Sequence, residues 1–171
     1  MLQEYGIHHP FEALPDRSPH FSLIDRFDAL LTIGRELAST RDTPLLLERT
    51  RAAFQTLLRP TLCEVVLLED IALERSEKPF SQHLWNQVLE SKSLVVSGED
   101  SAQSVMLTPL SLAGRVFAVV AISQTGLKRY FGEEEVRLAR WLVTQAEVAL
   151  ENVHTTARSD MRQLELPGYD N

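Results

Sequence analysis

The sequence has one cysteine, no long apolar run and no recognisable secretion signal. Because Cys63 stands alone among 171 residues, no internal disulfide can form, and a reducing cytoplasm is the expected compartment. The longest apolar run, Val116–Ile122, is too short to span a bilayer. The first ten residues also lack the apolar core of a signal peptide. We therefore expect a cytoplasmic protein without membrane insertion.

Basic residues are outnumbered, and this excludes one class of partner. The chain has 17 lysine and arginine residues against 24 aspartate and glutamate residues, which gives a net charge of −7. Nucleic-acid binding needs a basic patch on the protein surface, so no direct contact with nucleic acid is expected. Hydrophobic residues make up 44% of the chain, which is enough for one ordinary buried core.

Common catalytic and cofactor-binding motifs are absent as well. The sequence contains no GxSxG, P-loop, HExxH, CxxC or GxGxxG pattern, so we expect neither an enzyme nor a cofactor. His8, His9 and His20 could bind a transition metal, but neighbouring histidines on an irregular segment rarely form a closed site. No metal centre is predicted.

Three regions are distinguished along the chain. Residues 1–20 are rich in proline and predict an irregular arm, residues 21–158 one domain, and residues 159–171 a mobile tail. Apolar spacing predicts helices over 22–39, 43–58, 82–91 and 133–158, with Thr43 as the N-cap before Pro44. Strands are expected over 62–69, 93–97, 104–112 and 115–123, and 71–75 is a candidate for a further short strand. This order indicates an α+β fold, an antiparallel sheet of five or six strands with the N- and C-terminal helices packed on one face.

Three segments resemble the GAF family. They are LLTIGRELASTRDTPLLLERTRAAFQTLL from Leu30, SVMLTPLSLAGRVFAVVAIS from Ser104 and FGEEEVRLARWLVTQAEVALEN from Phe131. They are similar to the opening helix pair, the central hairpin and the closing helix of that family, and the likeness covers about Phe21 to Thr156. The sequences of these segments are most similar to those of GAF domains that accompany FHA domains, kinases or activators in bacterial regulators. The resemblance implies a GAF-like sandwich and a regulatory role.

Departures from the family guide the functional expectation. GAF domains that bind a ligand fold long segments over the sheet face opposite the terminal helices, whereas here about ten residues separate the first strand from the third helix. We expect no cavity above about 300 Å³ over the hairpin. The favoured function is a non-enzymatic signalling module that mediates protein–protein or interdomain signal transmission. The alternative is a small-molecule sensor with a reduced pocket, whose candidate lining residues are His83, Met106, Thr108 and Ser123.

Two further family activities are disfavoured by the residues present. The family's free-methionine-sulfoxide reductases use several cysteines in relay, and Cys63 alone cannot reproduce that relay. Its apolar strand context instead predicts a buried, unreactive thiol. The NKxxFxxDE pattern of cyclic-nucleotide-binding relatives is absent.

The closing helix carries a heptad repeat of apolar residues with a second apolar row beside it. The repeat is Val136, Ala139, Val143, Ala146, Leu150, Val153 and Ala157, and the second row is Leu138, Leu142 and Ala149. One row suffices to cover a sheet, so the other is left for a helix of the first segment or for a second subunit. We favour a homodimer. Its predicted interface residues are Leu23, Phe27, Leu30, Leu142, Ala146, Leu150 and Val153.

Overall fold

A computed structural model describes residues 23–98, 102–126 and 131–164 of the chain. The predicted arm over 1–20, the histidines in it and residues 165–171 of the predicted tail lie outside the described residues. The elements in order are α1 (Leu23–Ser39), α2 (Thr43–Leu58), β1 (Leu62–Leu67), α3 (Leu68–Ala72), α4 (Gln82–Ser91), β2 (Val95–Ser97), β3 (Gln103–Leu112), β4 (Arg115–Thr125) and α5 (Glu133–Leu164).

Four antiparallel strands form the sheet within the described residues, in the order β1-β4-β3-β2. The predicted count of five or six strands is therefore wrong. The candidate strand over 71–75 is replaced by α3 and the turn after it. Glu69 and Asp70 stand in the first turn of α3, where carboxylates complement the positive end of a helix. Among the described residues β1 pairs with β4 alone, so β1 is an edge strand.

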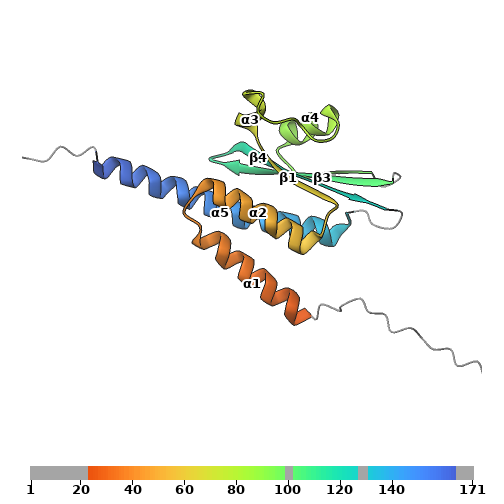
Figure 1. The fold of residues 1–171 in the computed structure, drawn as a ribbon, viewed down its shortest axis with the longest axis horizontal. Coiled ribbons are helices and arrows are strands. Elements are labelled where there is room, and N and C mark those ends of the chain that lie inside the picture. Colours follow the sequence, from red (N-terminus) through yellow and green to blue (C-terminus); the bar gives the residue numbers. More distant parts are fainter. Residues whose placement is uncertain (1–22, 99–101, 127–130, 165–171) are drawn as a thin grey trace, which may run out of the picture.

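The helices lie on both faces of the sheet, in unequal layers (Figure 1). The longer helices α2 and α5 pack on one face, and the short helices α3 and α4 cover the other. Helix α1 packs mainly on α5 and α2 and so forms an outer layer beyond them. The prediction that the terminal helices share one side of the sheet is confirmed, although α1 is separated from the strands by the other two.

Local signals explain most of the boundaries. The carboxylate of Asp42 accepts a hydrogen bond from the backbone N–H of Leu45 at 3.0 Å, so Asp42 is the N-cap of α2 rather than the predicted Thr43. Ala113 and Gly114 both have positive φ, at 50° and 76°, which is the geometry of a tight two-residue hairpin between β3 and β4. The hairpin predicted from the sequence is confirmed there.

Helix α5 is longer than predicted. It continues to Leu164, so residues 159–164 are helical where the sequence predicts the start of a mobile tail. All residues from Thr155 to Leu164 are exposed, and Figure 1 shows this end of the helix extending past the sheet. The terminal ten residues therefore contribute nothing to the core of the domain.

Candidate functional site

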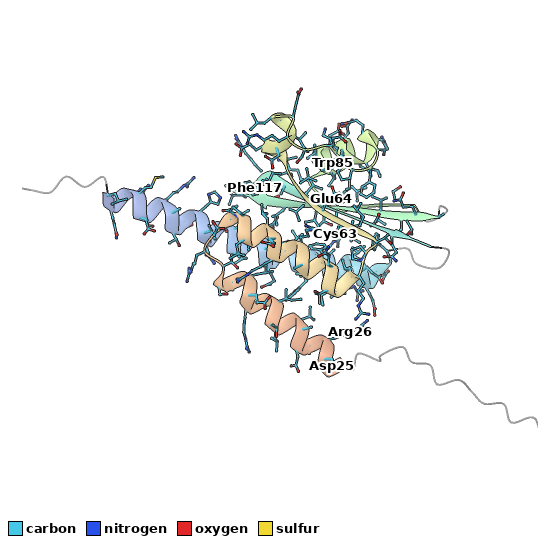
Figure 2. All side chains as sticks on the ribbon, in the orientation of Figure 1. Asp25, Arg26, Cys63, Glu64, Trp85 and Phe117 are labelled. Atoms are coloured by element: carbon cyan, nitrogen blue, oxygen red, sulfur yellow. The ribbon has the colours of Figure 1, made fainter. Side chains whose placement is uncertain are left out.

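The sheet face opposite the terminal helices is filled by side chains. Trp85 of α4 is fully buried against this face, and its indole N–H donates a hydrogen bond to the backbone oxygen of Pro79. Figure 2 shows Trp85 between α4 and the strands. The surrounding buried residues are Val66, Val88, Val95, Val105, Leu107, Val119 and Ala121. This face of the sheet, over which the sequence resemblance implied a ligand site, is thus filled by side chains of the chain itself.

The four residues predicted to line a reduced pocket do not come together. His83 is exposed on α4, whereas Met106 is fully buried in the core between the sheet and the long helices. Thr108 follows Met106 at a spacing of two and shares its face of β3, because side chains alternate along a strand. Ser123 pairs with Val105 and therefore lies on the opposite face. The predicted lining set is wrong as a site.

Two surface cavities occur elsewhere. The larger, of about 700 Å³, lies along the edge of β1, and the smaller, of about 340 Å³, lies between β3 and α5. The smaller cavity borders the hairpin at Thr108 but is also lined by Arg140 and Val143 of α5, so it lies on the face of the terminal helices and not on the opposite face, to which the expected limit of about 300 Å³ applies. Within the described part of the chain, the buried Oγ1 of Thr108 has no hydrogen-bond partner.

Cys63 on β1 is buried and held beside Arg51 of α2. The Arg51 Nε donates to the backbone oxygen of Cys63 at 3.2 Å, and the Cys63 thiol donates to the backbone oxygen of Arg51 at 3.7 Å. Burial raises the pKa of the Cys63 thiol to about 11, with Arg51 acting in the lowering direction and Glu64 adding to the rise. The thiol is therefore protonated at neutral pH, which is unfavourable for a nucleophile or a metal ligand.

The dimer residues predicted on α5 belong to the core of one chain. Leu142, Ala146 and Leu150 are fully buried and Val153 is 9% exposed, because α2 and α1 cover the apolar row that the sheet leaves free. Their assignment to a subunit interface is wrong. On α1, Phe27 is 63% exposed and Leu30 is half-buried, while the side chain of the predicted Leu23 lies outside the described residues.

Other exposed apolar residues near Phe27 were missed by the sequence argument. Leu31 is 51% exposed, Val148 is 54% exposed and Trp141 is half-buried. Val148 follows Trp141 by seven residues, a spacing that places both on one face of α5. The spacing of seven residues is present in the sequence, but the heptad row beside it has more members and dominates the apolar pattern of α5.

The described residues contain neither a metal-binding cluster nor a membrane-spanning helix. Among residues 23–98, 102–126 and 131–164, no three histidine, cysteine, aspartate or glutamate side chains are placed to hold a metal ion. In the same ranges, no helix combines the length and apolar character needed to cross a bilayer.

Comparison with known proteins identifies the fold. No known family and no curated protein matches the sequence. Solved structures do match, among them the GAF domain of an Acinetobacter phosphoenolpyruvate-protein phosphotransferase, at 15% identity and a TM-score of 0.56 over 78% of this chain and 96% of that one. The GAF domain of the Escherichia coli potassium sensor histidine kinase KdpD has 15% identity and a TM-score of 0.56 over 77% and 96%.

An enzyme appears among the matches as well. The free methionine-R-sulfoxide reductase from Neisseria meningitidis, in complex with its substrate, has 17% identity and a TM-score of 0.57 over 77% of this chain and 90% of that one. At these identities the likeness establishes the fold alone. The chain has the fold of GAF domains, as its sequence indicated.

Proposed function

We propose that the protein is a non-enzymatic GAF-type signalling module that transmits a signal to a partner protein or a neighbouring domain, and that it acts as a homodimer. The observation that carries the proposal is an apolar strip along the outer layer of helices, made of Phe27, Leu31, Trp141 and Val148. We call these residues the outer strip.

The outer strip has members on two neighbouring helices, α1 and α5. A Cβ at Gly34 would lie 3.9 Å from the Trp141 ring, so this face of α1 borders Trp141 directly. Phe27 precedes Gly34 by seven residues and shares that face, and Leu31 stands one helical turn after Phe27. Because α1 and α5 run in the same direction, a two-fold axis parallel to them would pair the outer strips of two chains in a parallel helical bundle (Figure 1).

Energetics favour covering the outer strip. Burying a side chain the size of leucine or phenylalanine stabilises an association by roughly 1.5–3 kcal/mol, and each chain contributes several. The exposed outer strip replaces Leu142, Ala146, Leu150 and Val153 as the proposed contact surface.

The state of Cys63 and the packing around Trp85 support a non-enzymatic role. The single buried thiol is protonated at neutral pH, and the face that holds ligands in GAF domains is filled by Trp85 and its neighbours. The alternative function, a small-molecule sensor, would use the cavity of about 340 Å³ beside the candidate lining residue Thr108, where Lys92, Arg140 and Glu147 supply charged groups.

Light scattering coupled to size-exclusion chromatography tests the dimer. The wild type should have the mass of two chains, and Leu31→Glu and Val148→Glu should each shift it toward one chain with an unchanged circular dichroism spectrum. Thr32→Glu adds the same charge at an exposed position of α1, one residue away from Leu31 and outside the outer strip, and should leave the mass unchanged. A wild type with the mass of one chain at every concentration would refute the proposal.

A further inference from the structure

The edge of β1 is open, and the cavity of about 700 Å³ runs along it. On one side stand Leu47, Glu48 and Arg51 of α2, and on the other the segment 76–79. Beyond β1 no strand of the described residues continues the sheet. Exposed strand edges present unused backbone donors and acceptors, to which an extended segment of another chain can add.

Backbone groups of β1 point into this cavity. The backbone oxygen of Cys63 accepts a hydrogen bond from the Arg51 side chain of α2, which lies outside the sheet, so we take the groups of residue 63 to face away from β4. In an antiparallel pair this orientation alternates along the strand, and the N–H and C=O of Val65 therefore face outward too. Val65 can form a two-hydrogen-bond pair with one residue of an added strand, with Leu47 and Pro79 as apolar walls.

Charges along the cavity favour a basic occupant. Its two cationic groups are oriented by neutral partners, because Arg51 donates to the backbone oxygen of Cys63 and the Lys78 Nζ lies 5.9 Å from the centre of the Trp85 ring. Its three carboxylates, Glu48, Glu64 and Glu77, have no ion-pair partner among the described residues. Figure 2 shows Glu64 on the edge strand beside Cys63. Three carboxylates against the two cations, Arg51 and Lys78, leave the lining with a net charge of −1.

We infer that the edge of β1 binds an extended, lysine- or arginine-containing segment of a partner protein by strand addition, with backbone hydrogen bonds to Val65 and basic side chains toward Glu48, Glu64 and Glu77. This deepens the proposed function by naming the chemistry of the partner, and it rests on that function only for the protein–protein role. The outer strip lies on the other side of α2 and α5 from this edge.

A defined peptide tests the inference by fluorescence anisotropy on the full chain. The probe is a fluorescein-labelled, end-capped seven-residue peptide of alternating lysine and valine. Its controls are the corresponding glutamate–valine peptide and the lysine–valine peptide with a methylated backbone nitrogen at its central residues. We expect only the unmodified lysine–valine peptide to bind, and both controls to bind at least about tenfold more weakly, since a tenfold change is 1.4 kcal/mol.

Variants of the protein distinguish the contribution of backbone hydrogen bonds to peptide affinity from the contribution of charge. Val65→Pro removes the outward N–H, which an edge strand tolerates, and should weaken binding about tenfold. Glu64→Gln should weaken binding several-fold, whereas Glu151→Gln, an exposed neutralisation on α5, should not. If Val65→Pro unfolds, hydrogen exchange at the Val65 amide of the wild type replaces it, with slower exchange expected once peptide is added.

Three results would overturn the inference. They are equal binding of the lysine–valine and glutamate–valine peptides, binding unaffected by backbone methylation, and unchanged exchange at Val65 with peptide bound. A Val65→Pro variant that loses the mass of a dimer would show that a second copy occupies the edge, which also contradicts a partner segment. Peptide binding can fail while the wild type keeps the mass of a dimer, so the two proposals fail separately.

Discussion

Gly34 of α1 lies against the indole of Trp141 on α5, with room for one methyl group between them. A Cβ at position 34 would meet two ring carbons at 3.9 Å, which is ordinary van der Waals contact. Glycine is therefore not required there for space, and its helical backbone does not require positive φ. The contact joins α1 to α5, and the residue of α1 that makes it is a glycine, which has a low helix propensity.

Gly34→Ala should stabilise the protein. Alanine in a helix interior is favoured over glycine by about 0.5–1 kcal/mol, and the new methyl group meets no clash. Urea unfolding followed by circular dichroism measures the gain. Gly114→Ala is the matched control, because its φ of 76° disfavours any side chain although no atom lies within 4 Å, and it should lose about 1 kcal/mol. A loss for Gly34→Ala would show that α1 packs closer to Trp141 than described.

Leu150→Glu should unfold the domain instead of separating two subunits. Leu150 is fully buried among the sheet, α2 and α5, and a carboxylate placed there has no partner. We expect a loss of about 4 kcal/mol or more, visible as a lost cooperative thermal transition. Leu31→Glu, whose leucine is 51% exposed, should retain the transition within about 1 kcal/mol. A folded, monomeric Leu150→Glu variant would restore the interface first predicted from the heptad row.

Trp85→Ala should open a space on the face opposite the terminal helices. Removing a fully buried tryptophan costs roughly 3–5 kcal/mol and also removes the donor to Pro79. If the lost indole leaves an apolar cavity, added free indole should raise the melting temperature of the variant and not of the wild type. Trp141→Ala, at a half-buried position, should cost less and show no rescue by indole.

Thr108→Val and Thr50→Val should have opposite effects. Thr108 is 2% exposed and its Oγ1 has no partner in the described part of the chain, so a methyl group in its place should be neutral or stabilising. Thr50 is fully buried as well, but its Oγ1 donates to the backbone oxygen of Leu46 at 2.7 Å. Replacing it should cost about 0.5–1.5 kcal/mol in chemical denaturation. A destabilised Thr108→Val variant would indicate that a water or ligand uses that hydroxyl.

Cys63 should make stability fall in alkaline solution. Its pKa is raised to about 11 in the folded state, above that of an unfolded thiol, so between about pH 9 and 11 the unfolded chain has lost the proton that the folded chain keeps. Stability is then lost as pH rises, by at most about 1.4 kcal/mol per pH unit. Cys63→Ala should lack this component. Equal slopes for the two proteins, or rapid thiol labelling of the native wild type, would contradict a buried, protonated thiol.

The helices and the hairpin could be predicted because their signals are local. The apolar spacing of α1, the alternation on either side of Ala113 and Gly114 and the carboxylates at the start of α5 each act within a few residues. Residues 71–75 were assigned wrongly because a short apolar segment fits a strand or a helix equally well. The carboxylates Glu69 and Asp70 favour a helix there only when β1 ends at Leu67, so that they fall in the first helical turn.

The candidate sites could be predicted less well, because they depend on which element covers which. Apolar periodicity shows that Leu142 and Ala149 are buried, but it does not distinguish a second subunit from α2 of the same chain. Met106 and Ser123 each fit a pocket wall in the sequence, and only the strand register places them on opposite faces. The open edge of β1 has no local signal at all, since it results from the absence of a neighbouring strand among the described residues.

The exposed end of α5 sets an angular relation as well as a distance. Ten residues, Thr155 to Leu164, continue the helix for about 15 Å past the last buried turn, and each residue rotates the helix by about 100°. Whatever is attached there is oriented by the number of residues between it and Val153. Removing one residue turns the attached part to a different side, whereas removing seven returns it almost to its original bearing and brings it about 10 Å closer to the sheet. The rotation of α5 at the point of attachment, more than the chemistry of its surface, would then determine the direction in which a movement of the domain displaces the attached part.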